Sequence, residues 1–99
     1  MTVYAPDIPP HVGEVIRHLP PDLKRSVKLA ISALSVDPSL GTPLVGELKG
    51  LWKYRVRRFR IVYATDARSR KLRIHAVGHR RAVYDEVADR LGRDPERKG

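Results

Sequence analysis

Two stretches in the second half of the chain, residues 52–64 and 72–77, alternate large apolar side chains with basic or small ones. A period of two with aromatic and β-branched residues is typical of strands that bury one face. The alternation breaks at Arg57-Arg58 and at the polar segment 66–70, so we expect three antiparallel strands joined by two turns. The expected inward positions are Trp52, Tyr54, Val56, Phe59, Ile61, Tyr63, Leu72, Ile74 and Ala76.

The remaining segments have helical periodicity. Apolar residues recur three and four positions apart in three places, which predicts three amphipathic helices. Paired prolines at 9–10 and 20–21 fit the first turns of the first two helices, where no amide donor is needed. The second helix is expected over residues 22–35, and the third from Arg81 to near Gly92. The apolar stripes are Val12, Val15, Ile16 and Leu19; Leu23, Val27, Ile31 and Leu34; and Val83, Val87 and Leu91.

The order of these elements predicts an α+β fold. Residues 2–5 indicate a short first strand stopped by Pro6, and the Gly- and Pro-rich segment 39–50 indicates a loop. The order is then β-α-α-β-β-β-α, a small antiparallel sheet with the N-terminal helical hairpin packed on one face. A chain of 99 residues without cysteine predicts one domain over residues 1–99 and no disulfide framework, with 93–99 as a frayed tail.

The second face of this sheet is expected to be positively charged, because alternate residues of a strand share a face. Val62, Ala64 and Val77 fall on the same face, so we expect the C-terminal helix to cover part of it. The basic side chains expected there are Lys53, Arg55, Arg57, Arg60, Arg73 and His75.

Positive charge is confined to one half of the sequence. Residues 1–51 carry five basic and five acidic side chains, whereas residues 52–99 carry fifteen and six, which accounts for the whole net charge of +9. One-sided positive charge steers and holds polyanions, and this favours a nucleic-acid partner. The chain shows neither a signal peptide nor an apolar run of ~20 residues, so we expect a soluble cytoplasmic protein without a membrane partner.

The residue types exclude several kinds of catalysis. Carboxylates are sparse in the expected strands, the four histidines form no metal-binding motif, and the glycines form no phosphate-binding loop. The remaining arginines, lysine, tyrosine and histidine can bind phosphate, stabilise charge on phosphorus and move a proton. That set suits metal-free RNA cleavage by the RNA's own 2′-hydroxyl, with no cofactor. Residue types alone still favour binding without cleavage, since basic clusters mostly only bind.

One segment points further, the run Val77-Gly-His-Arg-Arg-Ala-Val-Tyr84. Together with Leu48-Lys-Gly50, Trp52, Arg55-Val56 and the run 60–63, it resembles the RelE/ParE superfamily of toxins from bacterial type II toxin–antitoxin systems, and its RelE branch in particular. The similarity is specific over residues 48–87 and only architectural before them. It implies an endoribonuclease that cuts mRNA on the ribosome, with mRNA, rRNA and a cognate antitoxin protein as partners.

The resemblance also assigns roles to residues. It implies that Arg60 and Arg80 neutralise the scissile phosphate, that Arg55 stabilises the transition state with Lys53 beside it, and that Tyr84 orients or activates the 2′-hydroxyl. His79 is a candidate general acid. The catalytic candidates are Arg55, Arg60, Arg80, Tyr84 and His79, and the candidates for binding RNA or phosphate are Lys53, Arg57, Arg58, Arg73, His75 and Arg81.

The turn is where the chain departs from the family. Relatives often have Gly-Asp or Gly-Asn there, because favoured two-residue turns need positive φ. Arg57-Arg58 therefore predicts a strained or a longer turn that grips phosphate or rRNA. The aromatic that follows, often Tyr in relatives, is Phe59.

Each of these residues also has an alternative interpretation without a functional role. Tyr84, if it points inward, is core packing; Trp52 is expected in the core; and the arginines can form a solvated face. Two other functions also remain open: a ParE-like toxin of the same fold that binds DNA gyrase and cuts nothing, and a non-catalytic module that binds nucleic acid or the ribosome. The occupied Arg60, Arg80 and Tyr84 positions favour the nuclease.

Overall fold

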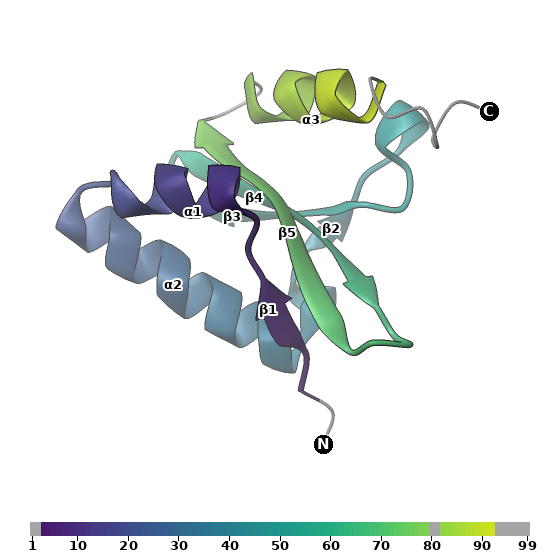
Figure 1. Ribbon diagram of the computed structural model, residues 1–99, viewed down its shortest axis with the longest axis horizontal. Helices are drawn as coiled ribbons and strands as arrows, with labels where there is room; N and C mark the ends of the chain where they lie inside the picture. Colours follow the sequence, from purple (N-terminus) through teal and green to yellow (C-terminus); the bar gives the residue numbers. More distant parts are fainter. Residues whose placement is uncertain (1–2, 80–81, 93–99) are drawn as a thin grey trace.

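The computed structural model describes residues 3–79 and 82–92 and has the expected α+β order of elements. Figure 1 shows α1 and α2 on one side of the sheet and α3 on the other. The elements are β1 (Ala5–Asp7), α1 (Pro10–Arg17), α2 (Pro21–Val36), η1 (Pro38–Leu40), β2 (Thr42–Pro43), η2 (Gly46–Leu48), β3 (Trp52–Val56), β4 (Phe59–Asp66), β5 (Lys71–His79) and α3 (Ala82–Gly92).

The five strands form one sheet in the order β1-β5-β4-β3-β2. Strands β3, β4 and β5 pair antiparallel as expected, and β2 adds a further antiparallel pair with β3. In contrast to the expected antiparallel sheet, β1 pairs parallel with β5. The first strand covers Ala5–Asp7, so the prediction that Pro6 stops a strand over residues 2–5 was wrong. Pro6 pairs with Leu72 at the edge of the sheet, and proline is tolerated there because one side of an edge strand donates no ladder hydrogen bond.

The segment 39–50 is not a simple loop. Thr42 pairs with Lys53 and Pro43 with Trp52, which makes β2 a second edge strand, and two short 3₁₀ helices flank it. Its Gly and Pro content hides this strand in the sequence, because a two-residue strand carries no alternation. The pairing depends on the edge that β3 offers.

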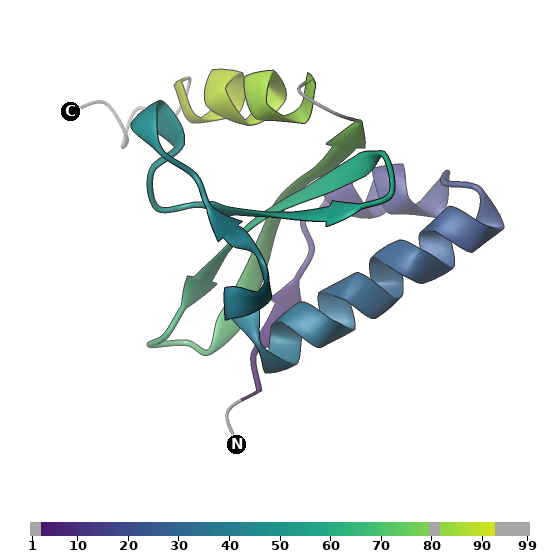
Figure 2. The same cartoon turned by 180° about the vertical axis from the view of Figure 1, so that it is seen from behind.

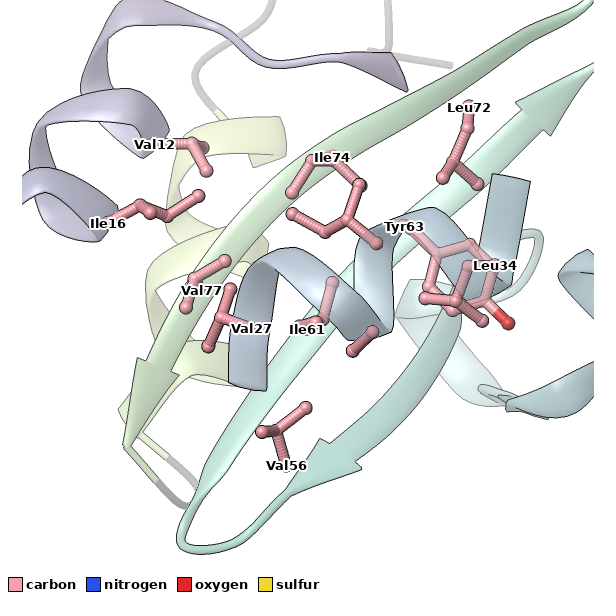
Figure 3. Packing of buried hydrophobic residues seen from close by; sticks show 12 residues of the cluster. Val12, Ile16, Val27, Leu34, Val56, Ile61, Tyr63, Leu72, Ile74 and Val77 are labelled. Atoms are coloured by element: carbon pink, nitrogen blue, oxygen red, sulfur yellow. The ribbon is translucent and has the colours of Figure 1, made fainter. Parts of the chain in front are cut away.

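The main core lies between the helical hairpin and the sheet (Figure 3). Three residues of the predicted α2 stripe are buried, with Val27 and Leu34 fully inaccessible, whereas Leu23 is only half-buried. In α1, Val12 and Ile16 are buried, but Val15 remains 38% exposed, because the stripe of this short helix is narrower than its sequence suggests. The sheet contributes Val56, Ile61, Tyr63, Leu72, Ile74 and Val77 to this core.

A bulge in β5 changes which residues face this core. Val62 pairs with Ala76 and Tyr63 pairs with Ile74, so His75 is an extra residue without a partner in β4. An extra residue reverses the facing of every side chain after it. Val77 therefore joins the main core and Ala76 the opposite face, the reverse of the assignment that strict alternation predicts.

The opposite face carries a second, smaller core under α3. It contains Leu48, Leu51, Val62, Ala76, Val83 and Val87, with Ala64 and Tyr84 packed at its margin. The C-terminal helix thus covers part of the sheet, as expected. Figures 1 and 2 show that α3 lies over the end of β5 and leaves the far end of the sheet uncovered.

The Tyr63 hydroxyl anchors the irregular segment before β3 to the core. It donates a hydrogen bond to the carbonyl of Pro38 and accepts one from the amide of Gly41 at 3.2 Å. The Tyr63 side chain is fully buried. Burial raises the pKa of its hydroxyl, and the Gly41 hydrogen bond only partly opposes this.

We expect Tyr63→Phe to lower the free energy of unfolding by about 2 kcal/mol, because Pro38 and Gly41 lose a buried partner. Because the pKa of Tyr63 is higher in the folded than in the unfolded protein, the residue stabilises the fold at pH values below its unfolded pKa of about 10. This contribution to the free energy of unfolding disappears as the pH rises through the folded pKa. Urea unfolding at pH 7 and at alkaline pH checks both points. The gap between wild type and variant should narrow in alkali, and a gap independent of pH would contradict this account.

Candidate functional site

Three basic side chains converge on the α3 side of the sheet, and we call them the basic cluster: Lys53, Arg55 and Arg60. Arg55 and Arg60 are directly opposite each other in the β3–β4 ladder. Lys53 precedes Arg55 by two residues and so shares its face. The prediction that Arg55 and Arg60 lie on one face beside the turn is confirmed.

The basic cluster lacks acidic partners within residues 3–79 and 82–92, where the ion pairs of arginine involve Arg17, Arg25, Arg73 and Arg90. Like charges directly opposite in an antiparallel pair destabilise a sheet. Arg60 and Lys53 are only half exposed, which weakens screening by water. The arrangement therefore favours an external anion that neutralises Arg55 and Arg60 together.

Helix α3 closes one side of the basic cluster. Gly78 pairs with Arg60, and a Cβ at Gly78 would lie 2.9 Å from the Cβ of Val83, so only glycine lets α3 approach so closely. Sequence reasoning treated Gly78 as the end of a strand. Gly78 in fact lies inside β5, which runs on to His79. A glycine inside a strand often marks the close approach of another backbone, and this signal was missed.

Tyr84 of α3 points toward the sheet. The Nζ atom of Lys53 lies 5.9 Å from the centre of the Tyr84 ring, a cation–π contact. The Tyr84 hydroxyl is buried and makes no hydrogen bond within the part of the chain that the structure describes. The structure thus brings Tyr84 next to Lys53 but leaves its hydroxyl covered.

The β3–β4 connection is a two-residue turn, so of the two predicted alternatives, a strained turn or a longer one, the structure has the strained turn. Val56 pairs with Phe59, and Arg57 between them has a φ of 56°. The left-handed region is unfavourable for a side chain with a Cβ. The Nε of Arg55 donates a hydrogen bond to the carbonyl of Arg57 at 2.9 Å, which ties the turn to the basic cluster.

Replacing Arg57 by glycine should stabilise the fold. Glycine adopts positive φ without the Cβ penalty, so we expect Arg57→Gly to raise the free energy of unfolding by about 0.5–1 kcal/mol. Arg70, in the β4–β5 turn, has a φ of 55°, and Arg70→Gly should give a similar gain. Arg58→Gly removes the same charge at a residue without positive φ and should give none. Denaturant unfolding of the three variants checks this, and an equal gain in all three would point to charge instead of strain.

The structure separates the other predicted residues from the basic cluster. His79 pairs with Phe59, and the two rings meet edge to face with their centres 5.3 Å apart, on the face opposite Arg60. Arg73 lies farther along the sheet and forms an ion pair with Asp7 at 3.2 Å. His75 occupies the bulge, where its carbonyl lies 3.3 Å from His11 Nε2. Arg80 and Arg81 lie outside the described residues.

Among the described residues, no group of three or more histidines and carboxylates is placed to hold a metal ion. None of the described helices is long and apolar enough to cross a membrane.

Comparison with known proteins identifies the family. Residues 11–84 match the family described as the ParE toxin of type II toxin–antitoxin systems, parDE. The chain belongs to this family. It is therefore a member of the RelE/ParE superfamily, as the sequence motifs indicated. No curated protein matches its sequence.

Solved structures of RelE toxins share the fold. The toxin–antitoxin complex RelBE2 from Mycobacterium tuberculosis is 29% identical and superposes with a TM-score of 0.72 over 81% of this chain and 94% of that one. A double arginine-to-alanine mutant of Escherichia coli RelE in the free state is 21% identical and superposes with a TM-score of 0.75 over 90% of this chain and 98% of that one. The archaeal RelE–RelB complex from Pyrococcus horikoshii is 19% identical and superposes with a TM-score of 0.65 over 80% of this chain and 97% of that one.

Proposed function

We propose that this protein is a translation-inhibiting endoribonuclease that cuts mRNA bound to the ribosome. One observation carries the proposal: Arg55 and Arg60 face each other across two strands, with Lys53 beside them and no carboxylate partner within the described ranges. Such a cation pair is unfavourable unless an anion binds between the two side chains. The resemblance to the RelE branch of the superfamily implies that this anion is a phosphodiester of RNA.

In the proposed reaction, the 2′-oxygen of the nucleotide before the cut attacks phosphorus and the bond from phosphorus to the 5′-oxygen breaks. The products are a 2′,3′-cyclic phosphate and a 5′-hydroxyl. Negative charge grows on the phosphate oxygens, where the guanidinium groups of Arg55 and Arg60 stabilise it. The 2′-hydroxyl proton leaves to a base, and the 5′-oxygen gains a proton.

Other residues keep narrower roles. Lys53 holds the RNA backbone beside the cluster, and Arg80 keeps the role of a second phosphate ligand that the family resemblance implies. Tyr84 contacts the 2′-hydroxyl only after α3 moves, since the hydroxyl is covered. His79 takes no part in the proposed proton transfers, because it lies with Phe59 on the other face.

The second candidate function is gyrase poisoning, which the match to the ParE family favours. Cleavage of mRNA on stalled ribosomes, followed by primer extension, separates the two functions. Site-specific cuts in mRNA with no gyrase-linked DNA breaks support the nuclease. Growth arrest with DNA breaks and intact mRNA would overturn it, and absence of both activities would favour a module that only binds nucleic acid.

We also propose a cognate antitoxin as partner, which two of the RelE structures contain in their own complexes. A shallow groove between α2 and β3 offers it a place. Leu29 on its rim is 65% exposed, and beyond Lys53 the outer edge of β3 is no longer paired with β2. An amphipathic antitoxin segment would cover both, by adding a strand to the edge or a helix to the groove. Its acidic side chains would neutralise Arg55.

A further inference from the structure

A second cavity lies on the other side of the β3–β4 turn, away from the basic cluster. It has a volume of about 370 Å³ and lies where the turn meets the corner between α1 and α2. Its size falls within the range of sites for small organic ligands. Its lining residues are Pro20, Asp22, Leu23, Arg57, Arg58 and Phe59.

The walls of this cavity differ in chemistry. Arg57 and Arg58 form a cationic wall and have no carboxylate partner within the described ranges. Phe59 and Leu23 are half-buried and form an apolar wall. Asp22 lies on the helix side, 3.7 Å from Arg25. A ligand that suits these walls carries an anionic group toward the turn and an apolar, planar group toward the helices.

Backbone strain at the turn supports a binding role. Arg57 keeps a φ of 56° at a position where glycine or asparagine is favoured. A strained residue in a functional segment is evidence for a constraint on its side chain. Arg57 keeps this backbone conformation while its side chain lines the cavity, and the ring of Phe59 is held by its edge-to-face contact with His79.

We propose that this cavity binds one unpaired nucleotide of the RNA, adjacent to the nucleotide whose phosphate binds Arg55 and Arg60. Its phosphate pairs with Arg57 and Arg58, and its base lies against Phe59 and Leu23, as unpaired bases do on aromatic side chains. This inference rests on the proposed function, because it takes RNA as the partner.

Continuity with the basic cluster gives the RNA a path. Arg57 follows Arg55 by two residues, so their Cα atoms are at most ~7 Å apart, which is within reach of the adjoining nucleotide. The hydrogen bond from Arg55 to the Arg57 carbonyl fixes the two positions relative to each other. Figure 2 shows the turn between β3 and β4 beside the corner of α1 and α2, so the RNA crosses the tip of the hairpin from one face to the other.

The test measures RNA binding without cleavage. Fluorescence anisotropy would follow a labelled single-stranded RNA of about six nucleotides, 2′-O-methylated so that it cannot be cut, with wild type, Arg57→Gly, Phe59→Leu and Arg70→Gly. Arg70→Gly is the matched control, because it removes the same charge from a residue of nearly the same positive φ in the turn at the other end of β4. Thermal unfolding establishes that each variant is folded.

We expect Arg57→Gly to weaken binding ~10-fold and to reduce the slope of log Kd against log salt by about one, as loss of a phosphate contact does. Phe59→Leu should weaken binding ~5–20-fold with an unchanged salt slope, because it removes stacking and no charge. Arg70→Gly should change binding less than ~2-fold.

Three results would overturn the inference. These are equal losses in Arg57→Gly and Arg70→Gly, wild-type binding in folded Phe59→Leu, or no binding by wild type at low salt. Intact RNA binding with loss of antitoxin neutralisation in Arg57→Gly and Phe59→Leu would assign the cavity to a protein partner instead. The proposed function fails separately, through absence of mRNA cuts by wild type while the oligonucleotide still binds as described.

Discussion

Arg60→Ala should reduce the rate of mRNA cleavage on programmed ribosomes by about 10²–10³-fold, the effect of removing one preorganised donor to a developing oxyanion. Arg60 is half-buried between Arg55 and Gly78, so no other described side chain lies opposite Arg55 in the ladder. Single-turnover cleavage followed on sequencing gels measures the rate. Ribosome binding should weaken far less than the rate, because Lys53, Arg55 and the turn arginines remain.

Arg68→Ala is the control for this experiment. Arg68 is an exposed residue of the β4–β5 turn, so its loss removes one positive charge far from the basic cluster. It should leave the cleavage rate within ~2-fold of wild type, because long-range attraction between exposed charges is screened by salt. Equal loss of rate in both variants would mean that total charge, and not the position of Arg60, determines activity.

Gly41→Ala should lower the free energy of unfolding by about 3 kcal/mol, the upper end of the usual cost of overpacking. A Cβ at Gly41 would lie 2.5 Å from the backbone oxygen of Lys53 and closer still to the Tyr63 hydroxyl. Neither neighbour moves freely, since one belongs to β3 and the other is fully buried. The clash breaks the hydrogen bond from Gly41 to Tyr63 and displaces β2 from the edge of the sheet. Urea unfolding monitored by circular dichroism measures the loss.

Gly13→Ala provides the contrast. Gly13 lies inside α1, and a Cβ there would meet only Ile8, at 3.9 Å. This variant should gain about 1 kcal/mol, because alanine is a better helix former than glycine. Combining Gly41→Ala with Tyr63→Phe should cost less than the sum of the two single changes, because the hydroxyl that the methyl group meets is gone. A simple sum would show that the Lys53 oxygen is the dominant obstacle.

The sequence predicts the layers of this fold well and its edges poorly. The stripes of α2 and the alternation of β3 and β4 come from burial, which repeats over several residues and is visible as a period. The edge strands β1 and β2 contain Pro6 and Pro43 and are two or three residues long. They form because a neighbouring strand has unpaired backbone N–H and C=O groups at its edge. The local sequence pattern does not reveal that such a neighbour is present.

Some features of the candidate site could likewise be predicted from the sequence, and others could not. Arg55 and Arg60 could be assigned to one face because they flank a turn in regular strands. The direction of Tyr84 could not be predicted, since it depends on how closely α3 approaches Gly78. The partner of Arg73 is Asp7, distant in sequence, and the face of His79 depends on a bulge several residues earlier.

That bulge also bears on how sequences of this family are compared. His75 is an insertion that the β5 strand absorbs locally, while Gly78 and His79 keep the facing that a regular strand one residue shorter would give them. A relative without the bulge would need a one-residue gap at this point of an alignment. Without the gap, its residue equivalent to Gly78 would be aligned one position off, and the residues of β5 after the bulge would be assigned to the wrong face of the sheet.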